Sequence, residues 1–431
     1  MILTRRNIRR TGAAVAIMAA AALAVTGCTE KLDGSGGCPI TCTDQSVQLQ
    51  TVTLDAVTLD STVLGGLGRG TEHQMLLASR GDTLDTRVII RFDTLPSTSK
   101  TSTSATAVPI AYLDSAMLTL QIDSAAINVG APVTMSVYDV DDSLAVDDTS
   151  ASAVAALFTP SRLVTSVQFD PGAVVDSLKI PLPKDFLLAK AQAHARLRLG
   201  LKATAMNKSV QFRVFASESG FGAKLRTRVS PDTSVAVLVM SPYSRTPVNN
   251  ASIANSLGDF TIVVKGTPPP PPDVLAIGGL PGTRAYLRFN IPLSISDSSL
   301  VVAATLLLSQ QPSTSPGASD SMLIQPLVVL AGGALSDPTR AAQVTAPLTV
   351  IALAPLNTSP GGFGPKEIQI GPVFRYWSAQ TAEQLPRAIV LASVTEDYSA
   401  QQALFYSSSA APALRPKLRI SFTHRSRIGI P

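Results

Sequence analysis

An internal repeat constrains the fold of this chain more than any other feature. The segment Thr86–Phe92 reads Thr-Arg-Val-Ile-Ile-Arg-Phe, and 197 residues later Thr283–Phe289 reads Thr-Arg-Ala-Tyr-Leu-Arg-Phe. Further matches follow in the same order at nearly the same spacing: Ala116–Leu120 with Ala304–Leu308, Asp176–Ile180 with Lys366–Ile370, Phe215–Ser219 with Phe405–Ser409, and Lys224–Arg226 with Lys417–Arg419. Chance rarely produces so many collinear matches. The sequence therefore predicts two copies of one domain, each of roughly 180 to 200 residues.

Each copy consists of short apolar segments of strand length. These segments are rich in Val, Ile, Leu and Thr and are separated by clusters of Gly, Pro, Ser and Asp. They include Val52–Leu59, Arg87–Phe92, Ala116–Ile122, Val133–Val140, Arg196–Leu201 and Val210–Phe215. Few of them keep a helical period, so the pattern predicts an all-β protein. A mature chain of about 400 residues is too long for one sandwich and suits two.

The first 27 residues have the layout of an export signal. Four arginines at positions 5, 6, 9 and 10 precede the apolar run 13–25, which is shorter than the roughly 20 residues that cross a bilayer. The run ends in Val25-Thr26-Gly27-Cys28, which resembles the lipobox of bacterial lipoproteins. The resemblance implies cleavage before Cys28 and lipidation of its thiol and new N-terminus. An ordinary signal peptide with a chance cysteine is the alternative.

A lipidated cysteine implies a location in the cell envelope. We expect the mature chain to be anchored to a membrane, with the outer membrane favoured, and to face the periplasm or the surface. Residues 4–8 also loosely resemble a twin-arginine signal, so the Sec and twin-arginine export routes both stay open. The polar, Gly-rich residues that follow Cys28 predict a flexible tether between the lipid and the folded part.

The predicted boundary between the two copies lies between Pro231 and Pro272. The five consecutive prolines of Pro268–Pro272 form a stiff extended segment that cannot join a central strand. Val235–Met240 and Phe260–Val264 could be strands of either domain. The predicted parts are a signal peptide (1–27), a tether (28–46), a first β-sandwich domain (47–245), and a second β-sandwich domain (246–431) that includes a proline-rich segment (267–272).

Charge and cysteine content exclude several classes of function. Removal of the signal leaves 31 basic residues (35 − 4) against 30 acidic ones, so nothing indicates a nucleic-acid surface. With Cys28 acylated, Cys38 and Cys42 remain, and such a pair outside the cytoplasm most often forms a disulfide. Structural zinc needs four ligands, which this segment does not supply.

Several strand motifs recur in both copies and resemble a known family. Each copy has a Thr-Arg-x-x-x-Arg-Phe strand, an Ala-x-Leu-x-Leu strand, and a Phe-x-Ser-x-Ser segment followed by a Lys-Leu-Arg strand. In the second copy Glu367–Ile370 and Trp377 fit a late strand and a short helix. Together these motifs resemble the DNRLRE-type domain, which is similar to family 96 carbohydrate-binding modules. The first copy departs by carrying Phe186 and Leu187 where the second has Tyr376 and Trp377.

The resemblance implies a jelly-roll β-sandwich in an extracellular, polysaccharide-associated protein. Alternate side chains of a strand face opposite sides, so one face holds Arg87 and Arg91 in the first copy, and Arg284, Tyr286 and Arg288 in the second. An exposed arginine strip could bind the carboxylates or sulfates of an acidic polysaccharide. The alternative is that these arginines pair with acidic residues of neighbouring strands. Aromatic residues make up only 5% of the chain, which does not support a flat aromatic platform for neutral sugars.

The sequence contains no motif for catalysis. The histidines His73, His194 and His424 are scattered, and no GxSxG, HExxH or phosphate-loop pattern occurs. Carboxylates cluster at Asp139, Asp141, Asp142, Asp147 and Asp148. They could hold structural calcium, but an EF-hand would need Gly in place of Leu144 and Glu in place of Ser150, so a solvated hairpin loop fits better. We expect no catalytic residue, no cofactor and no metal site.

These observations predict a non-catalytic envelope lipoprotein that binds polysaccharide or acts as an adhesive or structural module. Two alternatives stay open. One is a purely structural envelope protein that binds other proteins, and the other is a polysaccharide hydrolase or lyase whose site no motif reveals.

Overall fold

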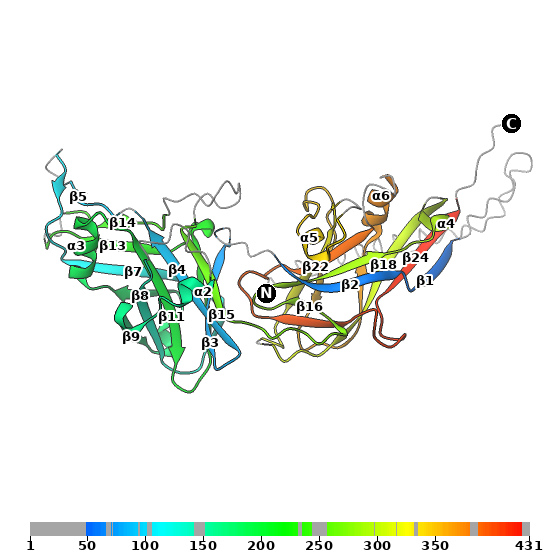
Figure 1. Cartoon of the computed structure of the whole chain (residues 1–431), viewed down its shortest axis with the longest axis horizontal. Helices are drawn as coiled ribbons and strands as arrows, with labels where there is room; N and C mark the ends of the chain where they lie inside the picture. Colours follow the sequence, from blue (N-terminus) through cyan, green and yellow to red (C-terminus); the bar gives the residue numbers. More distant parts are fainter. Residues whose placement is uncertain are drawn as a thin grey trace, which may run out of the picture. The chain divides into compact units, whose positions relative to one another are not determined.

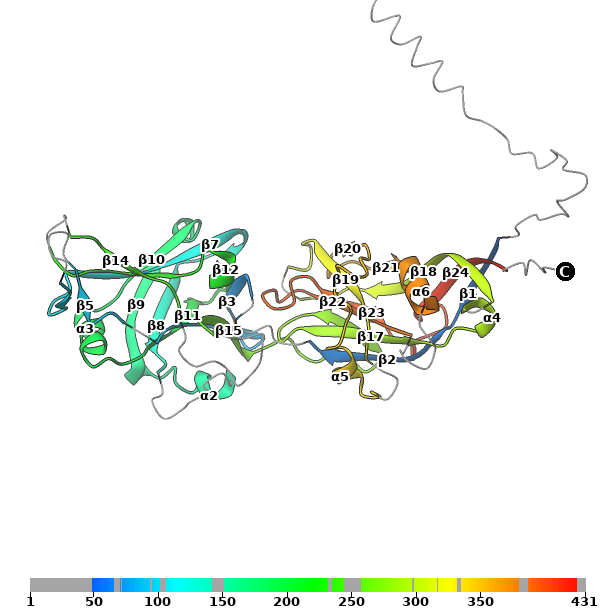
Figure 2. The same cartoon turned by 90° about the horizontal axis from the view of Figure 1, so that it is seen from above.

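The chain folds into two large antiparallel sheets, which confirms the predicted all-β class. The computed structural model describes residues 49–65, 70, 72–93, 95–100, 106–141, 151–231, 235–243, 257–296, 298–315, 317–331, 335–379 and 387–424. Each of the two sheets has 11 strands among these residues. We call them the N-terminal sandwich and the C-terminal sandwich (Figures 1 and 2).

The N-terminal sandwich has the strand order β14-β13-β7-β12-β3-β4-β11-β8-β9, with β10 paired to β7 and β15 paired to β4. Its strands are β3 (Gln74–Arg80), β4 (Leu84–Phe92), β7 (Ser115–Val129), β8 (Val133–Asp139), β9 (Leu163–Phe169), β10 (Ser177–Pro181), β11 (Leu197–Ala205), β12 (Val210–Phe215), β13 (Lys224–Arg228), β14 (Leu238–Met240) and β15 (Asp259–Lys265). A separate two-stranded sheet consists of β5 (Thr98–Ser99) and β6 (Val108–Pro109).

The C-terminal sandwich has the order β1-β24-β18-β23-β16-β17-β22-β19-β20, with β21 paired to β18 and β2 paired to β17. Its strands are β1 (Gln50–Leu54), β2 (Val57–Leu64), β16 (Val274–Gly278), β17 (Thr283–Phe289), β18 (Ser299–Gln311), β19 (Met322–Val328), β20 (Leu356–Thr358), β21 (Gly364–Gln369), β22 (Ala388–Ser393), β23 (Gln402–Tyr406) and β24 (Lys417–His424).

The two orders match strand for strand, so the repeat in the sequence is also a repeat in the structure. Strand β4 contains Thr86–Phe92, and its counterpart β17 is Thr283–Phe289. The long strands β7 and β18, which contain the two Ala-x-Leu-x-Leu motifs, also take equivalent places.

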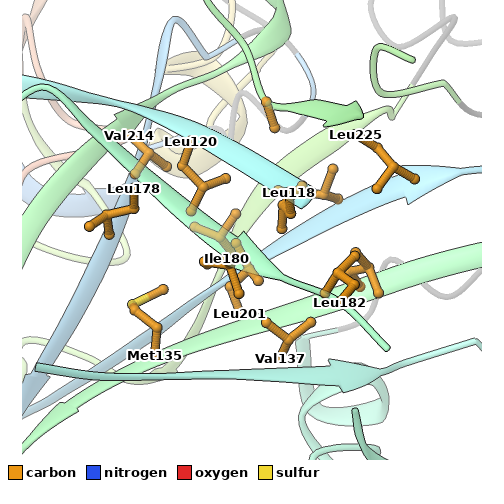
Figure 3. Close-up of a cluster of buried hydrophobic side chains, with 14 of the residues drawn as sticks. Leu118, Leu120, Met135, Val137, Leu178, Ile180, Leu182, Leu201, Val214 and Leu225 are labelled. Carbon is orange, nitrogen blue, oxygen red and sulfur yellow. The ribbon is translucent and has the colours of Figure 1, made fainter. Parts of the chain in front are cut away.

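Each sheet curls over a core because its longest strand pairs with different neighbours along its length. In the N-terminal sandwich, β7 pairs with β10 and β13 along residues 115–121 and with β12 along residues 122–129. Figure 3 shows Leu118 of β7 and Ile180 of β10 in one cluster with Val137 of β8 and Leu201 of β11, all of them fully buried. Full burial of such a side chain stabilises the fold by about 1.5 to 3 kcal/mol.

The outer face of the repeated strand is also covered, which the sequence did not predict. In the N-terminal sandwich Ile89 packs in a second cluster with Phe260 and Ile262 of β15. In the C-terminal sandwich Tyr286 packs in the equivalent way with Val63 of β2. The expected solvated face is therefore a small second core in both sandwiches.

Strand pairing corrects the predicted domain boundaries at both ends. Residues 50–64, which form β1 and β2, were assigned to the first domain, but they pair with β24 and β17 of the C-terminal sandwich. Residues 259–265, which form β15, were assigned to the second domain, but they pair with β4 of the N-terminal sandwich. We call residues 50–64 the N-terminal arm, and β14 with β15 the internal arm. The boundary was wrong because period-2 patterns show that a segment is a strand but do not identify its partner.

The helices are short. They are α2 (Ala151–Ala155), α3 (Lys184–Gln192), α4 (Leu293–Ser296), α5 (Pro338–Ala341) and α6 (Gly371–Ala379), with 3₁₀ turns η1 (Pro160–Arg162), η2 (Pro171–Ala173) and η3 (Ser217–Ser219). Trp377 of α6 packs against Phe289 and Phe374 and is only 6% exposed, so it belongs to the core. Within the described residues no helix has the length and apolar character needed to cross a membrane.

Candidate ligand-binding site

The arginines of the repeated strands contact acidic partners. In the N-terminal sandwich Arg87 forms an ion pair with Asp85 of its own strand, at 2.8 Å from Nη2 to Oδ2. Its guanidinium also lies over the Phe158 ring, 4.6 Å from the ring centroid. Both contacts hold Arg87 against the protein, and only 11% of its side chain is exposed.

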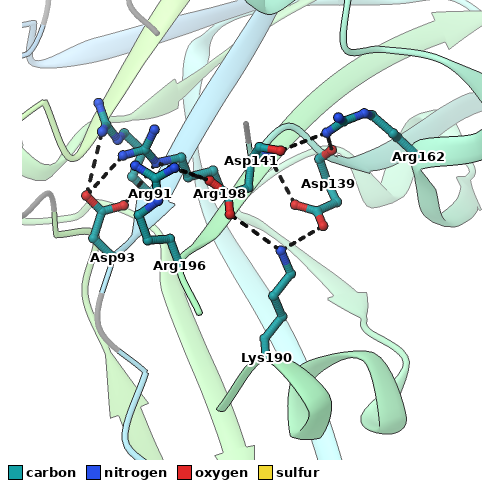
Figure 4. Close-up of polar contacts among 8 residues, drawn as sticks. All are labelled: Arg91, Asp93, Asp139, Asp141, Arg162, Lys190, Arg196 and Arg198. Carbon is teal, nitrogen blue, oxygen red and sulfur yellow. Dashed lines mark hydrogen bonds and ion pairs between the residues drawn. The ribbon is translucent and has the colours of Figure 1, made fainter. Parts of the chain in front are cut away.

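Arg91 lies in a buried network of charges (Figure 4). Its Nη2 is 3.6 Å from Oδ2 of Asp93, and Arg198 donates from Nε to Oδ1 of the same carboxylate at 3.1 Å. The network continues to Asp141, whose Oδ1 is 3.0 Å from Nη2 of Arg196. Arg91 and Asp93 are each 2% exposed and Arg198 is fully buried, so this network fixes the ends of β4 and β11 rather than presenting charge to solvent.

In the C-terminal sandwich Arg284 forms a bidentate pair with Glu396 and donates from Nη1 to the Ala342 carbonyl at 3.2 Å. Burial raises the pKa of Glu396, while the bonds from Arg284 act in the opposite direction. Tyr286 is 2% exposed, and burial raises the pKa of its hydroxyl. Arg288 is half-buried. The five residues therefore do not form an open cationic strip, and the alternative of acidic partners describes Arg87, Arg91 and Arg284.

The acidic cluster lies partly in the same network. Lys190 of α3 is 2.8 Å from Oδ2 of Asp139 and 3.8 Å from Oδ2 of Asp141. Arg162 donates to the backbone carbonyls of both residues. Among the described residues, no group of three or more His, Cys, Asp or Glu side chains could hold a metal.

Several predicted positions lie outside the described residues. They are Cys28, Cys38, Cys42, Asp142, Asp147 and Asp148. The predicted lipidation and disulfide therefore stay predictions, and the calcium alternative for the acidic cluster falls largely on residues that are not described.

A cavity of about 620 Å³ in the C-terminal sandwich is a better candidate for a ligand site. The N-terminal arm, β16 and β23 line it, together with the proline-rich segment. Its volume lies within the range of about 300 to 1,000 Å³ that is typical of small-molecule sites. Four of the five prolines, all except Pro270, are exposed. These rings form one rigid apolar wall.

Hydroxyl groups and one carboxylate form the polar side of this cavity. Asp60 of β2 accepts hydrogen bonds from the backbone N–H of Ser408 at 2.6 Å and from its Oγ at 2.7 Å. Ser409 donates to Asp273 at 3.1 Å and bonds the Ser407 hydroxyl at 2.6 Å. The lining contains no Lys, Arg or His side chain. The chemistry of this cavity therefore suits a neutral ligand rich in hydroxyl groups better than a polyanion.

Gln402 is the side chain of the cavity best placed to recognise a ligand. Its backbone pairs with Gly278 in the sheet, and Ser315 Oγ bonds its backbone N–H and carbonyl. The residue is 6% exposed, and it lines the cavity. A side-chain amide can donate to and accept from a ligand at once.

No pattern in the sequence marks this site. Its residues come from the beginning of the folded chain, from the proline-rich segment and from β23. They meet only because the N-terminal arm pairs with β17, and no motif marks Asp60 or Gln402.

Comparisons with known proteins do not assign this chain to a family. No protein-family model matches it, and no curated protein matches it. Among solved structures it matches the infectious bursal disease virus Gx strain at 10% identity and a TM-score of 0.13, over 87% of this chain and 76% of that chain. It also matches T=1 particles derived from infectious bursal virus at 11% identity and a TM-score of 0.13, over 88% and 74%.

A third match is a structure of manganese lipoxygenase of Gaeumannomyces graminis with part of zonadhesin of Komagataella pastoris. Identity is 12% and the TM-score is 0.12, over 73% of this chain and 78% of that chain. Scores this low carry no argument about fold or function.

Proposed function

We propose that this chain is a non-catalytic module of the cell envelope that binds a polysaccharide in the cavity beneath the proline-rich segment. The observation that carries the proposal is the lining of this cavity, which combines several hydroxyl groups and the side chain of Gln402 with a row of prolines. The hydroxyl groups of a neutral sugar would bond the polar groups of the lining, and the apolar faces of its rings would pack on the prolines.

The same proposal includes the lipid anchor on Cys28 and the likeness to DNRLRE-type domains that the repeated motifs suggest. The tether would join the N-terminal arm, which pairs with β24 and β17. The anchor would then attach directly to the sandwich that contains the cavity.

The test is calorimetric titration of the soluble chain that starts after Cys28 with neutral and acidic oligosaccharides. We expect a neutral oligosaccharide to bind and the Gln402→Ala variant to bind it about 2- to 10-fold more weakly, because a typical hydrogen bond contributes about 0.5 to 1.5 kcal/mol. Gln401→Ala is the matched control, since the neighbouring Gln401 amide already bonds Gly317 and Ser399. Equal affinity of the Gln402→Ala variant and the wild type would contradict the proposal, as would binding to no neutral glycan.

A purely structural role is the second candidate, and one observation favours it. Each arm supplies strands to the sandwich formed by the other half of the chain, which ties the two sandwiches together twice. If the same titrations show no glycan binding while the folded chain stays membrane-bound, the structural role is favoured.

A further inference from the structure

The two arms occupy equivalent positions in the two sandwiches. In sequence, the N-terminal arm precedes β3, and the internal arm precedes the equivalent strand β16. In the sheets, β2 pairs with β17 of the C-terminal sandwich, and β15 pairs with the equivalent strand β4 of the N-terminal sandwich. The N-terminal arm is followed in the sequence by the N-terminal sandwich but pairs with the C-terminal sandwich. The internal arm is followed by the strands of the C-terminal sandwich but pairs with the N-terminal sandwich.

The two arms also make the same contacts. Asp60 lies opposite Leu287 and Asp259 opposite Ile90, which are equivalent positions of the repeated strand. Asp60 accepts bonds from the N–H and Oγ of Ser408, and Asp259 accepts them from the N–H and Oγ of Ser217. The two serines lie in the matched Phe-x-Ser-x-Ser segments, one position apart in the alignment.

In both arms a threonine lies two residues after this aspartate, and its hydroxyl makes the same kind of contact. Thr62 Oγ1 accepts from the N–H of Ala276 in β16 at 2.9 Å, and Thr261 Oγ1 accepts from the N–H of Leu76 in β3 at 3.1 Å. These equivalent contacts make each arm a docking element of the same kind, with an Asp-x-Thr signature.

The two arms differ in the direction in which they reach their sandwiches along the chain. The internal arm completes the sandwich whose other strands precede it. The N-terminal arm completes the C-terminal sandwich, whose other strands follow it in the sequence. The C-terminal sandwich of another copy of the chain offers the same acceptor, because the contacts are local and do not depend on which chain supplies the arm.

The N-terminal arm is also the more weakly held of the two. In β15 the first four residues, Asp259–Ile262, are buried. In β2 only Val63 is buried, and β1 has no buried residue. An arm that buries less apolar surface detaches more readily, since the stability of docking grows with the area removed from water.

We propose that the N-terminal arm is a donor element that pairs either with the C-terminal sandwich of its own chain or with that of a second copy. The partner is thus another molecule of this chain, joined by strand exchange between β1–β2 and β24–β17. Intrachain closure dominates in dilute solution, because the effective concentration of the arm at the acceptor of its own chain does not depend on protein concentration. Crowding of lipid-anchored copies on a membrane would favour exchange between chains.

Cysteine cross-linking tests this proposal at a contact of the arm. Thr51 Oγ1 of β1 lies 2.8 Å from Ser421 Oγ of β24, and the two residues are partners in register. The background is the full-length chain with Cys28→Ser, Cys38→Ser and Cys42→Ser. One population carries Thr51→Cys. The second carries Ser421→Cys and a tag that increases its mass. The two are unfolded together, refolded over a range of concentrations, oxidised, and separated on a non-reducing gel.

We expect a mixed disulfide dimer whose fraction rises with protein concentration. A chain that carries both substitutions should close within itself at low concentration, which shows that the variants fold with the arm in place. The control pair is Thr58→Cys with Ser421→Cys, because Thr58 lies on β2 beside β17 and should give no dimer above background.

Two results would overturn the proposal. One is a double variant that closes within itself while the mixed populations give no more dimer than the control pair at any concentration. The other is failure of the double variant to cross-link at all, which would show that the arm does not pair with β24.

Discussion

The carboxylate of Asp259 should make the N-terminal sandwich more stable in mild acid. This residue is 1% exposed and accepts bonds from the N–H of Ser217 at 3.1 Å and from its Oγ at 2.9 Å. Burial is the largest influence and raises the pKa of Asp259 from 3.8 to about 6, although the bonds from Ser217 oppose it. Between pH 3.8 and about pH 6, the Asp259 carboxyl therefore keeps its proton in the folded state but has lost it in the unfolded state.

The sign and size of the effect follow from linkage. A folded pKa above the unfolded one means that stability rises as pH falls through about 6, and the gain is nearly complete below the unfolded value of 3.8. Between pH 7 and pH 4 a shift of this size contributes about 2 to 3 kcal/mol to the free energy of unfolding.

Denaturant unfolding of wild type and Asp259→Asn at several pH values measures this contribution as a difference. The wild type should gain about 2 to 3 kcal/mol relative to the variant between pH 7 and pH 4. Asp60→Asn is the matched control, because Asp60 holds the equivalent place in the other sandwich and should leave the transition of the N-terminal sandwich unchanged. Parallel pH profiles for the wild type and the Asp259→Asn variant would refute the reasoning.

Two further predictions concern the buried charges and the anchor. Arg198→Met should lower the free energy of unfolding by about 3 to 5 kcal/mol, because it removes one partner of a buried ion pair with Asp93. Arg419→Met, at the exposed pair with Glu367, should lower it by under about 1 kcal/mol. Equal losses in thermal or denaturant unfolding would contradict this prediction. Cys28→Ala should move the protein from the detergent-extracted membrane fraction to the soluble fraction or leave unprocessed precursor, and unchanged fractionation on an immunoblot would disprove lipidation at this residue.

The repeat and the strand content could be predicted from the sequence because both depend on local pattern. Val88, Ile90 and Phe92 alternate along β4, and all three are in the main core as their period predicts. The matched segments at Thr86 and Thr283 occupy equivalent strands for the same reason.

The partner of each strand could not be predicted, because pairing between distant segments leaves no local signal. The pattern of Val57–Leu64 indicates a strand but does not show that it pairs with β17 rather than β4. The candidate cavity depends on that pairing, since Asp60 belongs to this strand, and so it was missed. We expected Arg91 on an exposed face. Strand β15, which covers β4, and Arg198, which pairs with Asp93, are both remote from Arg91 in the sequence, so the local pattern does not show that Arg91 is buried.

Deletion of residues 49–64 followed by hydrogen exchange tests the exchanged arms most directly. The arm pairs with β17 and β24, so its loss should sharply reduce amide protection in these two strands of the C-terminal sandwich. Protection in β4 and β11 of the N-terminal sandwich should persist, because β15 still covers β4. Loss of protection in β4 with β17 intact would show that the arm pairs with the copy that follows it and would contradict the account.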